Sequence, residues 1–338
     1  LWAPRPASSV ERLLSVLTTL GIAFAGYLAL PDRMRAANLY LVSVGAALAA
    51  ATAIFLNFIA RDLDEDGGGL QRGLVVIALF AWPAIAWLRS RERDIEALTL
   101  AILIATATVV VGGTSPVPIA LAGGAVVYAL TSLWPKGGAS ATGALMALVV
   151  LLAPLLPFVV GPVLTGRLAG GPLAEGIEAW RAIVASDPVR LLTGHGFGAL
   201  ARERLDGLLP AGTPSWAPVQ IWYEFGLVGA FVGAAALWSG PRGAVTSYAP
   251  LLPGVIAAYA TAFTLALFGI GTGQMWWLNV LALLVIAFVA AERGQFRTSR
   301  PRALLFGAAR EDAAARRPAA PRPAVPQRPT LPAGSHPR

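Results

Sequence analysis

Nine long runs of apolar residues, separated by short polar segments, make up most of this sequence. A helix needs about 20 apolar residues to cross the roughly 30 Å hydrocarbon core of a bilayer. The runs predict membrane spans over Leu13–Leu30, Leu39–Ala60, Gly73–Leu88, Leu98–Gly112, Pro116–Trp134, Thr142–Val160, Val219–Trp238, Ala249–Ile270 and Met275–Ala290. Charged residues are only 13% of the chain, against roughly 25% in soluble proteins. We therefore expect an all-α, polytopic transmembrane helical bundle of about nine spans over residues 1–292.

The segments between these runs differ in charge. Every second segment is basic, and this set holds Arg33, Arg35, Arg89, Arg91, Arg93, Lys136 and Arg242. The segment Arg61–Arg72 instead holds four carboxylates. Because short cytoplasmic loops carry an excess of basic residues, the basic set is predicted to be cytoplasmic. The long segment Gly161–Pro218 then becomes one large periplasmic loop.

The C-terminal stretch 293–338 is rich in Pro, Ala and Arg and has almost no large apolar residue after Phe306. Such a segment cannot bury a core, so we expect a disordered, basic, cytoplasmic tail. Its arginines supply much of the net charge of +8 and fit attraction to anionic membrane lipids. No aromatic platform accompanies them, so nucleic-acid binding is not expected. At the other end, the sequence that begins at Leu1 does not have the pattern of a signal peptide. Whether further helices precede Leu1 stays open.

Composition also limits the chemistry. The chain has no cysteine, and its only histidines are His195 and His336. Disulfides and thiolate chemistry are therefore excluded, and neither a metal site nor any other cofactor is expected. Lys136 is the only lysine among many arginines, alanines and glycines, which is typical of a GC-rich bacterial genome.

The long loop contains an amphipathic segment. It reads PLAEGIEAWRAIVASDPVRLLTGHGFGAL from Pro172, with Ile177, Trp180, Ile183 and Val184 at helical spacing. This pattern predicts a helix that lies on the membrane surface with Trp180 as its interfacial anchor. The helix should end at Asp187-Pro188, because the residue before a proline avoids helical backbone angles.

A glycine-rich turn, Gly194-His195-Gly196-Phe197-Gly198, follows this helix. Glycines allow a positive φ or a close backbone approach. Without a preceding strand, the spacing is only a weak sign of a phosphate-binding loop. Glu224 then lies near the outer end of the next span, and an ionisable residue in a span is a candidate functional residue.

Three features follow one another here: the loop helix with its tryptophan, the glycine-rich turn, and a helix that begins with Glu224-Phe-Gly-Leu-Val-Gly. This order resembles the O-antigen ligase and O-antigen polymerase family of bacterial inner-membrane proteins. The resemblance is best over Glu178–Ala230 and looser from Leu39 onward, including Leu70-Gln71-Arg72-Gly73. It implies transfer of a glycan from an undecaprenyl-diphosphate carrier to a lipid or glycan acceptor in the periplasm. Such a reaction belongs to lipopolysaccharide or other cell-surface polysaccharide biosynthesis.

This sequence differs from the family pattern at two places. The family's His-Asn pair, about nine residues before the Glu, falls on Ser215 and Trp216. The family's arginine, one turn before the loop tryptophan, falls on Gly176. The expected catalytic residues are therefore His195, as the remaining imidazole base, and Glu224.

Three arginines, Arg72, Arg181 and Arg190, are candidates for binding the diphosphate, which suits the planar guanidinium fork. Simpler roles stay open: the arginines as headgroup anchors, His195 as an exposed turn residue, and Glu224 as a support for the helix entry. For the whole chain, the alternative is a non-catalytic membrane protein, either a family member without chemistry or a transporter or permease subunit. Few charges lie inside the spans, which disfavours transport.

Overall fold

The computed structural model describes residues 6–32, 34, 36–59, 68–159, 171–210, 212–246, 249–272 and 274–295. In these ranges, all regular secondary structure is helical. The residues belong to one compact unit, Leu1–Phe296. The helices are α1 (Pro6–Ala29), α2 (Ala36–Ile59), α3 (Gly68–Arg89), α4 (Asp94–Gly112), α5 (Val117–Leu133), α6 (Pro135–Leu152), α7 (Leu156–Val159), α9 (Pro172–Ser186), α10 (Arg190–Thr193), α11 (Ala199–Leu205), α12 (Ala217–Ala244), the 3-10 helix η1 (Ala249–Leu251), α13 (Leu252–Leu267) and α14 (Met275–Gln295).

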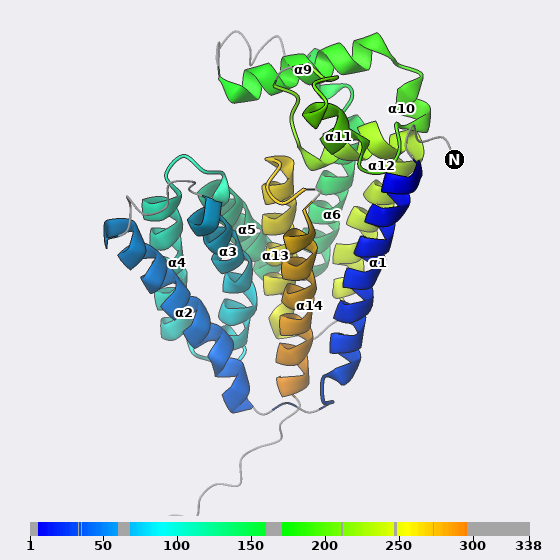
Figure 1. Cartoon of the computed structure of the whole chain (residues 1–338). Coiled ribbons are helices and arrows are strands. Elements are labelled where there is room, and N and C mark those ends of the chain that lie inside the picture. The colour runs from blue at the N-terminus through cyan, green and yellow to red at the C-terminus, as the bar shows by residue number, and fades with distance from the viewer. Residues whose placement is uncertain are drawn as a thin grey trace, which may run out of the picture. The chain divides into compact units, whose positions relative to one another are not determined.

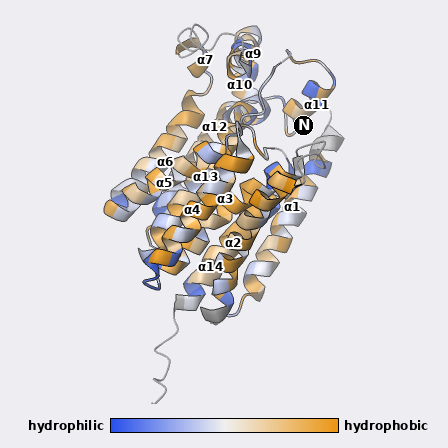
Figure 2. Cartoon of the chain, turned by 90° about the vertical axis from the view of Figure 1, so that its left-hand side faces the viewer, coloured by the Kyte–Doolittle hydropathy of each residue, from blue (hydrophilic) through white to orange (hydrophobic). Residues whose placement is uncertain are grey.

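Each of the nine predicted apolar runs contains a helix of 16 or more residues or most of one. Seven of these helices, α1 to α4, α6, α12 and α14, are long and apolar enough to cross a membrane, whereas α5 and α13 have only 17 and 16 residues. Hydrophobic residues follow the helices of the bundle, and hydrophilic residues gather near helix ends (Figure 2). The predicted class, a helical membrane bundle, is confirmed. The third and fourth runs, Gly73–Leu88 and Leu98–Gly112, extend to helices of 22 and 19 residues.

At one end of the bundle, the segments that carry arginines contact one another. Arg91, after α3, donates from Nη2 to the carbonyl of Gly294 at 3.0 Å. Arg293, at the end of α14, donates to the carbonyl of Leu30, after α1. We call this the basic end. Helices α9, α10 and α11 lie at the opposite end, called the loop end (Figure 1). These two contacts place the C-terminal ends of α1, α3 and α14 at the same end of the bundle.

Small residues set the packing inside the bundle. A Cβ on Gly124 of α5 would lie 2.2 Å from Thr261 Oγ1 of α13 and 2.5 Å from the Trp82 ring of α3. The same two side chains form a buried hydrogen bond, in which Trp82 Nε1 donates to Thr261 Oγ1 at 2.8 Å. Glycine thus lets α5 pack directly on α3 and α13 while both polar groups are satisfied.

Some predicted boundaries need correction. Helix α6 ends at Leu152, not Val160, and a turn containing Pro154 follows it, because proline lacks the N–H that a helix needs. Helix α14 continues to Gln295, so the predicted tail boundary after residue 292 is too early. The rest of the predicted tail, 296–338, lies outside the described residues, as do 60–67 of the acidic segment and 160–170 of the long loop.

The predicted role of Trp180 as a membrane anchor is wrong. Its side chain is 1% exposed, and its indole N–H donates to the carbonyl of Ala153 at 3.0 Å. It packs in a cluster with Leu200, Val219 and Trp222. The apolar face of α9 is therefore covered by protein, and this contact joins the loop helices to α6 and α12.

Candidate functional site

Helix α12 is broken at Gly226, whose φ of 61° and ψ of −151° are not helical. In an unbroken helix, the carbonyls of Tyr223 and Glu224 would accept hydrogen bonds from N–H groups four residues later. Here the N–H of His195 donates to the Tyr223 carbonyl at 2.8 Å, and the N–H of Gly196 donates to the Glu224 carbonyl at 2.9 Å. The glycine-rich turn is thus docked onto the break in α12.

This docking depends on glycine on both sides. Gly194 has a φ of +71°, and a Cβ there would lie 2.4 Å from the carbonyl oxygen of Glu224. A Cβ on Gly226 would lie 2.7 Å from both the nitrogen of Gly194 and the carbonyl oxygen of Leu192. The prediction that these glycines provide positive φ angles and close approach is confirmed, since Gly196 and Gly198 also have positive φ.

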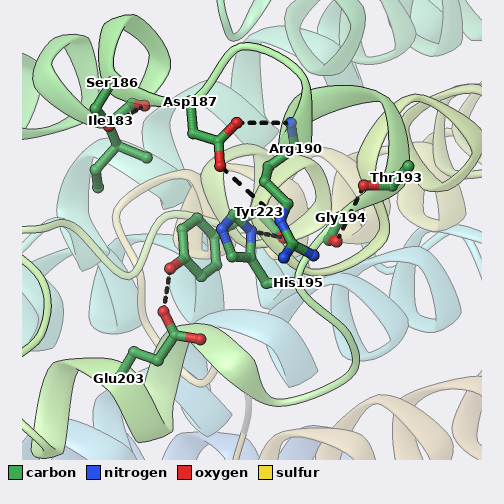
Figure 3. A network of polar contacts seen from close by, with 9 residues as sticks. All are labelled: Ile183, Ser186, Asp187, Arg190, Thr193, Gly194, His195, Glu203 and Tyr223. Atoms are coloured by element: carbon green, nitrogen blue, oxygen red, sulfur yellow. Dashed lines mark hydrogen bonds and ion pairs between the residues drawn. The ribbon is translucent and has the colours of Figure 1, made fainter. Parts of the chain in front are cut away.

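The break fixes the orientation of the His195 side chain. Its ring stacks on the Tyr223 ring with centroids 3.9 Å apart and an interplanar angle of 3°. Nδ1 lies 3.0 Å from the Tyr223 carbonyl oxygen. A carbonyl only accepts hydrogen bonds, so Nδ1 carries a proton, and in the neutral ring the lone pair is then on Nε2. The Tyr223 hydroxyl in turn donates to Glu203 of α11 (Figure 3).

A cavity of about 330 Å³ opens beside this pair. Its polar lining includes His195, Tyr223, Glu203 and Asp187, and its apolar lining includes Trp222. Volumes of about 300–1,000 Å³ are usual for small-molecule sites. Asp187 also accepts a hydrogen bond from the backbone N–H of Arg190 at 3.3 Å and lies 3.9 Å from its Nε. One cavity therefore brings together an imidazole, a phenol, two carboxylates and, through Asp187, an arginine.

Glu224 lies elsewhere. Its side chain is fully buried, and Oε1 accepts a hydrogen bond from Gln220 Nε2 at 3.2 Å. It is not among the described residues that line the His195 cavity. The guanidinium groups of Arg12 and Arg202 act electrostatically on its carboxylate. The two predicted catalytic residues take part in neighbouring backbone hydrogen bonds, His195 with Tyr223 and Glu224 with Gly196, but the described lining of the cavity includes only His195.

Sequence reasoning missed four residues around this site: Arg12, Arg202, Glu203 and Tyr223. Arg202 Nη1 donates to the carbonyl of Phe197 at 3.2 Å, and the Arg12 guanidinium lies 5.8 Å from the Phe197 ring. A signal existed for Tyr223, which directly precedes Glu224. Arg12 belongs to α1, far away in sequence, and nothing in the sequence pattern pointed to it.

The three predicted diphosphate-binding arginines have separate partners. Arg72 lies over Trp276, with the guanidinium carbon 5.9 Å from a ring centroid; Arg181 lies over Phe158 at 5.6 Å; and Arg190 pairs with Asp187. None of the contacts between described residues joins two of these arginines. Of the three, Arg190 is the one that a contact between described residues connects to the cavity, through Asp187.

The two positions that depart from the family pattern are packed. The carbonyl of Ser215 accepts a hydrogen bond from Thr272, and a Cβ on Gly269 would lie 2.5 Å from Ser215 Oγ. Ser215 therefore contacts the turn between α13 and α14. A Cβ on Gly176 would lie 3.1 Å from the Trp216 ring. A long side chain at position 176 would need Trp216 to move.

What this site can do follows from its own groups. The chain matches no protein-family profile, no curated protein and no solved structure. In the described ranges, no group of three or more His, Cys, Asp or Glu side chains could hold a metal ion. The cavity offers an imidazole with a free Nε2, which can accept a proton from a hydroxyl, and a nearby guanidinium, which can bind an anion.

Proposed function

We propose that this chain is a membrane-embedded glycan transferase of the O-antigen ligase or polymerase type. Its donor is a glycan on undecaprenyl diphosphate, and its acceptor is a hydroxyl group of a lipid or a glycan. The observation that carries the proposal is the fixed imidazole: stacking on Tyr223 and the Nδ1 hydrogen bond leave the Nε2 of His195 free beside a cavity of suitable size. The resemblance over Glu178–Ala230 supplies the reaction class.

In the proposed step, Nε2 of His195 takes the proton of the acceptor hydroxyl. The acceptor oxygen then bonds to the anomeric carbon, and the bond from that carbon to the diphosphate oxygen breaks. The lipid diphosphate leaves with the electron pair. The imidazolium that forms keeps its Nδ1 hydrogen bond to the Tyr223 carbonyl, which stabilises the positive charge. Arg190, which pairs with Asp187 in the cavity lining, would bind the leaving diphosphate.

The proposed location is the inner membrane of a bacterium, crossed about nine times. The basic end and the C-terminal tail would face the cytoplasm, and α9, α10 and α11 would face the periplasm. Reporter fusions after Gly170 should then give a periplasmic signal, and fusions after Arg310 a cytoplasmic one. If both fusions reported the same side, the span count would be wrong.

The alternative is a non-catalytic family member or a transporter or permease subunit. The observation that favours the non-catalytic reading is that Ser215 and Gly176, at the family's functional positions, are used for packing. A transporter would need ionisable groups in the middle of the spans. The cavity with His195 instead lies at the loop end.

Glycolipid profiles of cells with and without the gene separate these readings. The transferase predicts that deletion removes a glycan product and leaves its lipid-linked donor in excess. Wild-type protein should restore the product, and His195→Ala should not, although it inserts normally. A deletion profile identical to wild type would support the non-catalytic alternative.

A further inference from the structure

A groove runs along the side of the bundle between α3, α4 and α5. Its lining residues are far in sequence from those of the His195 cavity. Its volume is about 680 Å³. Small side chains create it: α4 contributes Ala97, Ala101 and Ala105, and α5 contributes Ala122 and Ala125. Larger residues at these positions would fill the space between the two helices.

The groove faces the surrounding membrane. Leu98, Ile102 and Val109 of α4 line it and are 58% to 62% exposed, as expected for side chains that contact lipid. Its lining extends along α4 from Asp94 to Val109, which is about 22 Å at 1.5 Å per residue. One leaflet of hydrocarbon is only about 15 Å thick. An extended acyl chain can therefore lie in the groove along its whole length.

The end of the groove near the basic end of the bundle is polar. Arg89 Nε lies 3.2 Å from Asp94 Oδ1, and the two side chains are 50% and 71% exposed. The Arg89 guanidinium also lies over the Tyr128 ring, 5.8 Å from its centroid, and all three side chains line the groove. Thr108 is satisfied within its own helix by the carbonyl of Ala105. The groove thus combines an apolar channel with one positive and one negative charge at one end.

We propose that this groove is a binding site for one acyl chain of a phospholipid whose headgroup carries both a phosphate and a primary ammonium group. The phosphate would bind the guanidinium of Arg89, which is half exposed, and the ammonium would bind Asp94. A purely anionic headgroup would meet the like charge of Asp94. A quaternary ammonium headgroup has no N–H to donate to that carboxylate. The site is independent of the proposed glycan transfer.

The site can be tested on the full chain in lipid nanodiscs. The probe is a trace of phosphatidylethanolamine with a photoactivatable group in one acyl chain. After illumination and proteolysis, mass spectrometry should find the label in peptides from α3, α4 and α5. Unlabelled phosphatidylethanolamine should compete about threefold better than phosphatidylglycerol or phosphatidylcholine, since an exposed charge pair contributes only modestly. Equal competition by the three lipids would overturn the headgroup assignment.

Two pairs of variants locate the site. Ala105→Phe should abolish labelling of these peptides because the ring occupies the groove. Thr106→Phe adds the same ring to an exposed neighbour that is outside the described lining, so labelling should persist. Asp94→Asn should remove the preference for phosphatidylethanolamine, while Glu96→Gln, an exposed neighbour paired with Arg93, should preserve it. Unchanged labelling in Ala105→Phe, or an unchanged preference in Asp94→Asn, would overturn the proposal.

Discussion

Two close approaches of helices, one in the bundle and one at the loop end, both depend on glycine but have opposite effects on the backbone. At Gly124, α5 meets the side chains of Trp82 and Thr261, the helix stays regular, and the polar groups bond to each other. At Gly226, backbone meets backbone, the helix breaks, and its carbonyls bond to a loop. The first arrangement stabilises the bundle. In the second, the carbonyls of Tyr223 and Glu224 bond to the glycine-rich turn instead of to N–H groups of α12, and this fixes the side chain of His195.

The largest expected effect tests whether the loop-end arrangement serves chemistry. His195→Ala should lower the rate of glycan transfer by about 10²–10⁴-fold, the usual loss when a general base is removed. The measurement is product formation in membranes supplied with lipid-linked donor. His336→Ala, at the other histidine, is the matched control and should be neutral. Wild-type activity in His195→Ala, in a protein shown to transfer glycans, would remove the imidazole from the step and leave Glu224 to be tested next.

A second variant tests the break in α12. Gly226→Ala places a Cβ 2.7 Å from backbone atoms at a positive φ, so the turn carrying His195 must separate from α12. The strain costs about 1–3 kcal/mol, and activity should fall by about tenfold or more while the protein still inserts. Gly243→Ala, in the same helix with open space around it, should change neither activity nor thermal stability. Full activity in Gly226→Ala would show that the break does not position the site.

The same comparison shows which features of the structure could be predicted from the sequence. Each apolar run is a local property, so all nine helices could be found from the sequence. The amphipathic pattern of α9 showed that one face is apolar, but it could not show that protein, not lipid, covers Trp180. The contact between His195 and Tyr223 spans 28 positions, and Arg12 reaches the site from α1. Such contacts depend on how helices pack, which no local pattern contains.

Within the bundle, Gly124→Ala should reduce stability without a specific effect on catalysis. The new methyl group would lie 2.2 Å from Thr261 Oγ1 and 2.5 Å from the Trp82 ring, so α5 must move away. Overpacking of this kind costs about 1–3 kcal/mol. Thermal unfolding in detergent measures it, with Gly123→Ala as control because its nearest neighbour would be 3.8 Å away. Activity per folded molecule should stay at the wild-type value; a specific loss would mean that the two regions are coupled.

Arg190 gives a smaller effect at the loop end. Arg190→Ala should weaken the use of donor about tenfold through lost contact with the diphosphate, with insertion unchanged. Arg190→Lys should recover only part of this loss, because a point charge lacks the guanidinium fork. Arg204→Ala, an exposed arginine on α11, is the control. The dependence of the initial rate on donor concentration is the measurement, and equal rates for Arg190→Ala and wild type would exclude Arg190 from donor binding.

The smallest expected effect concerns Ser215, which stands where the O-antigen ligase and polymerase proteins that the sequence resembles have a histidine. Its backbone carbonyl, not its hydroxyl, accepts the hydrogen bond from Thr272 that joins the loop to the α13–α14 turn. Ser215→Ala keeps that carbonyl, so stability should stay within about 0.5 kcal/mol of wild type and activity should be close to normal. Thr272→Val removes the donor and should cost about 1 kcal/mol in the same unfolding measurement. A large loss of activity in Ser215→Ala would give the hydroxyl a chemical role, and the base assigned to His195 would then have to be reconsidered.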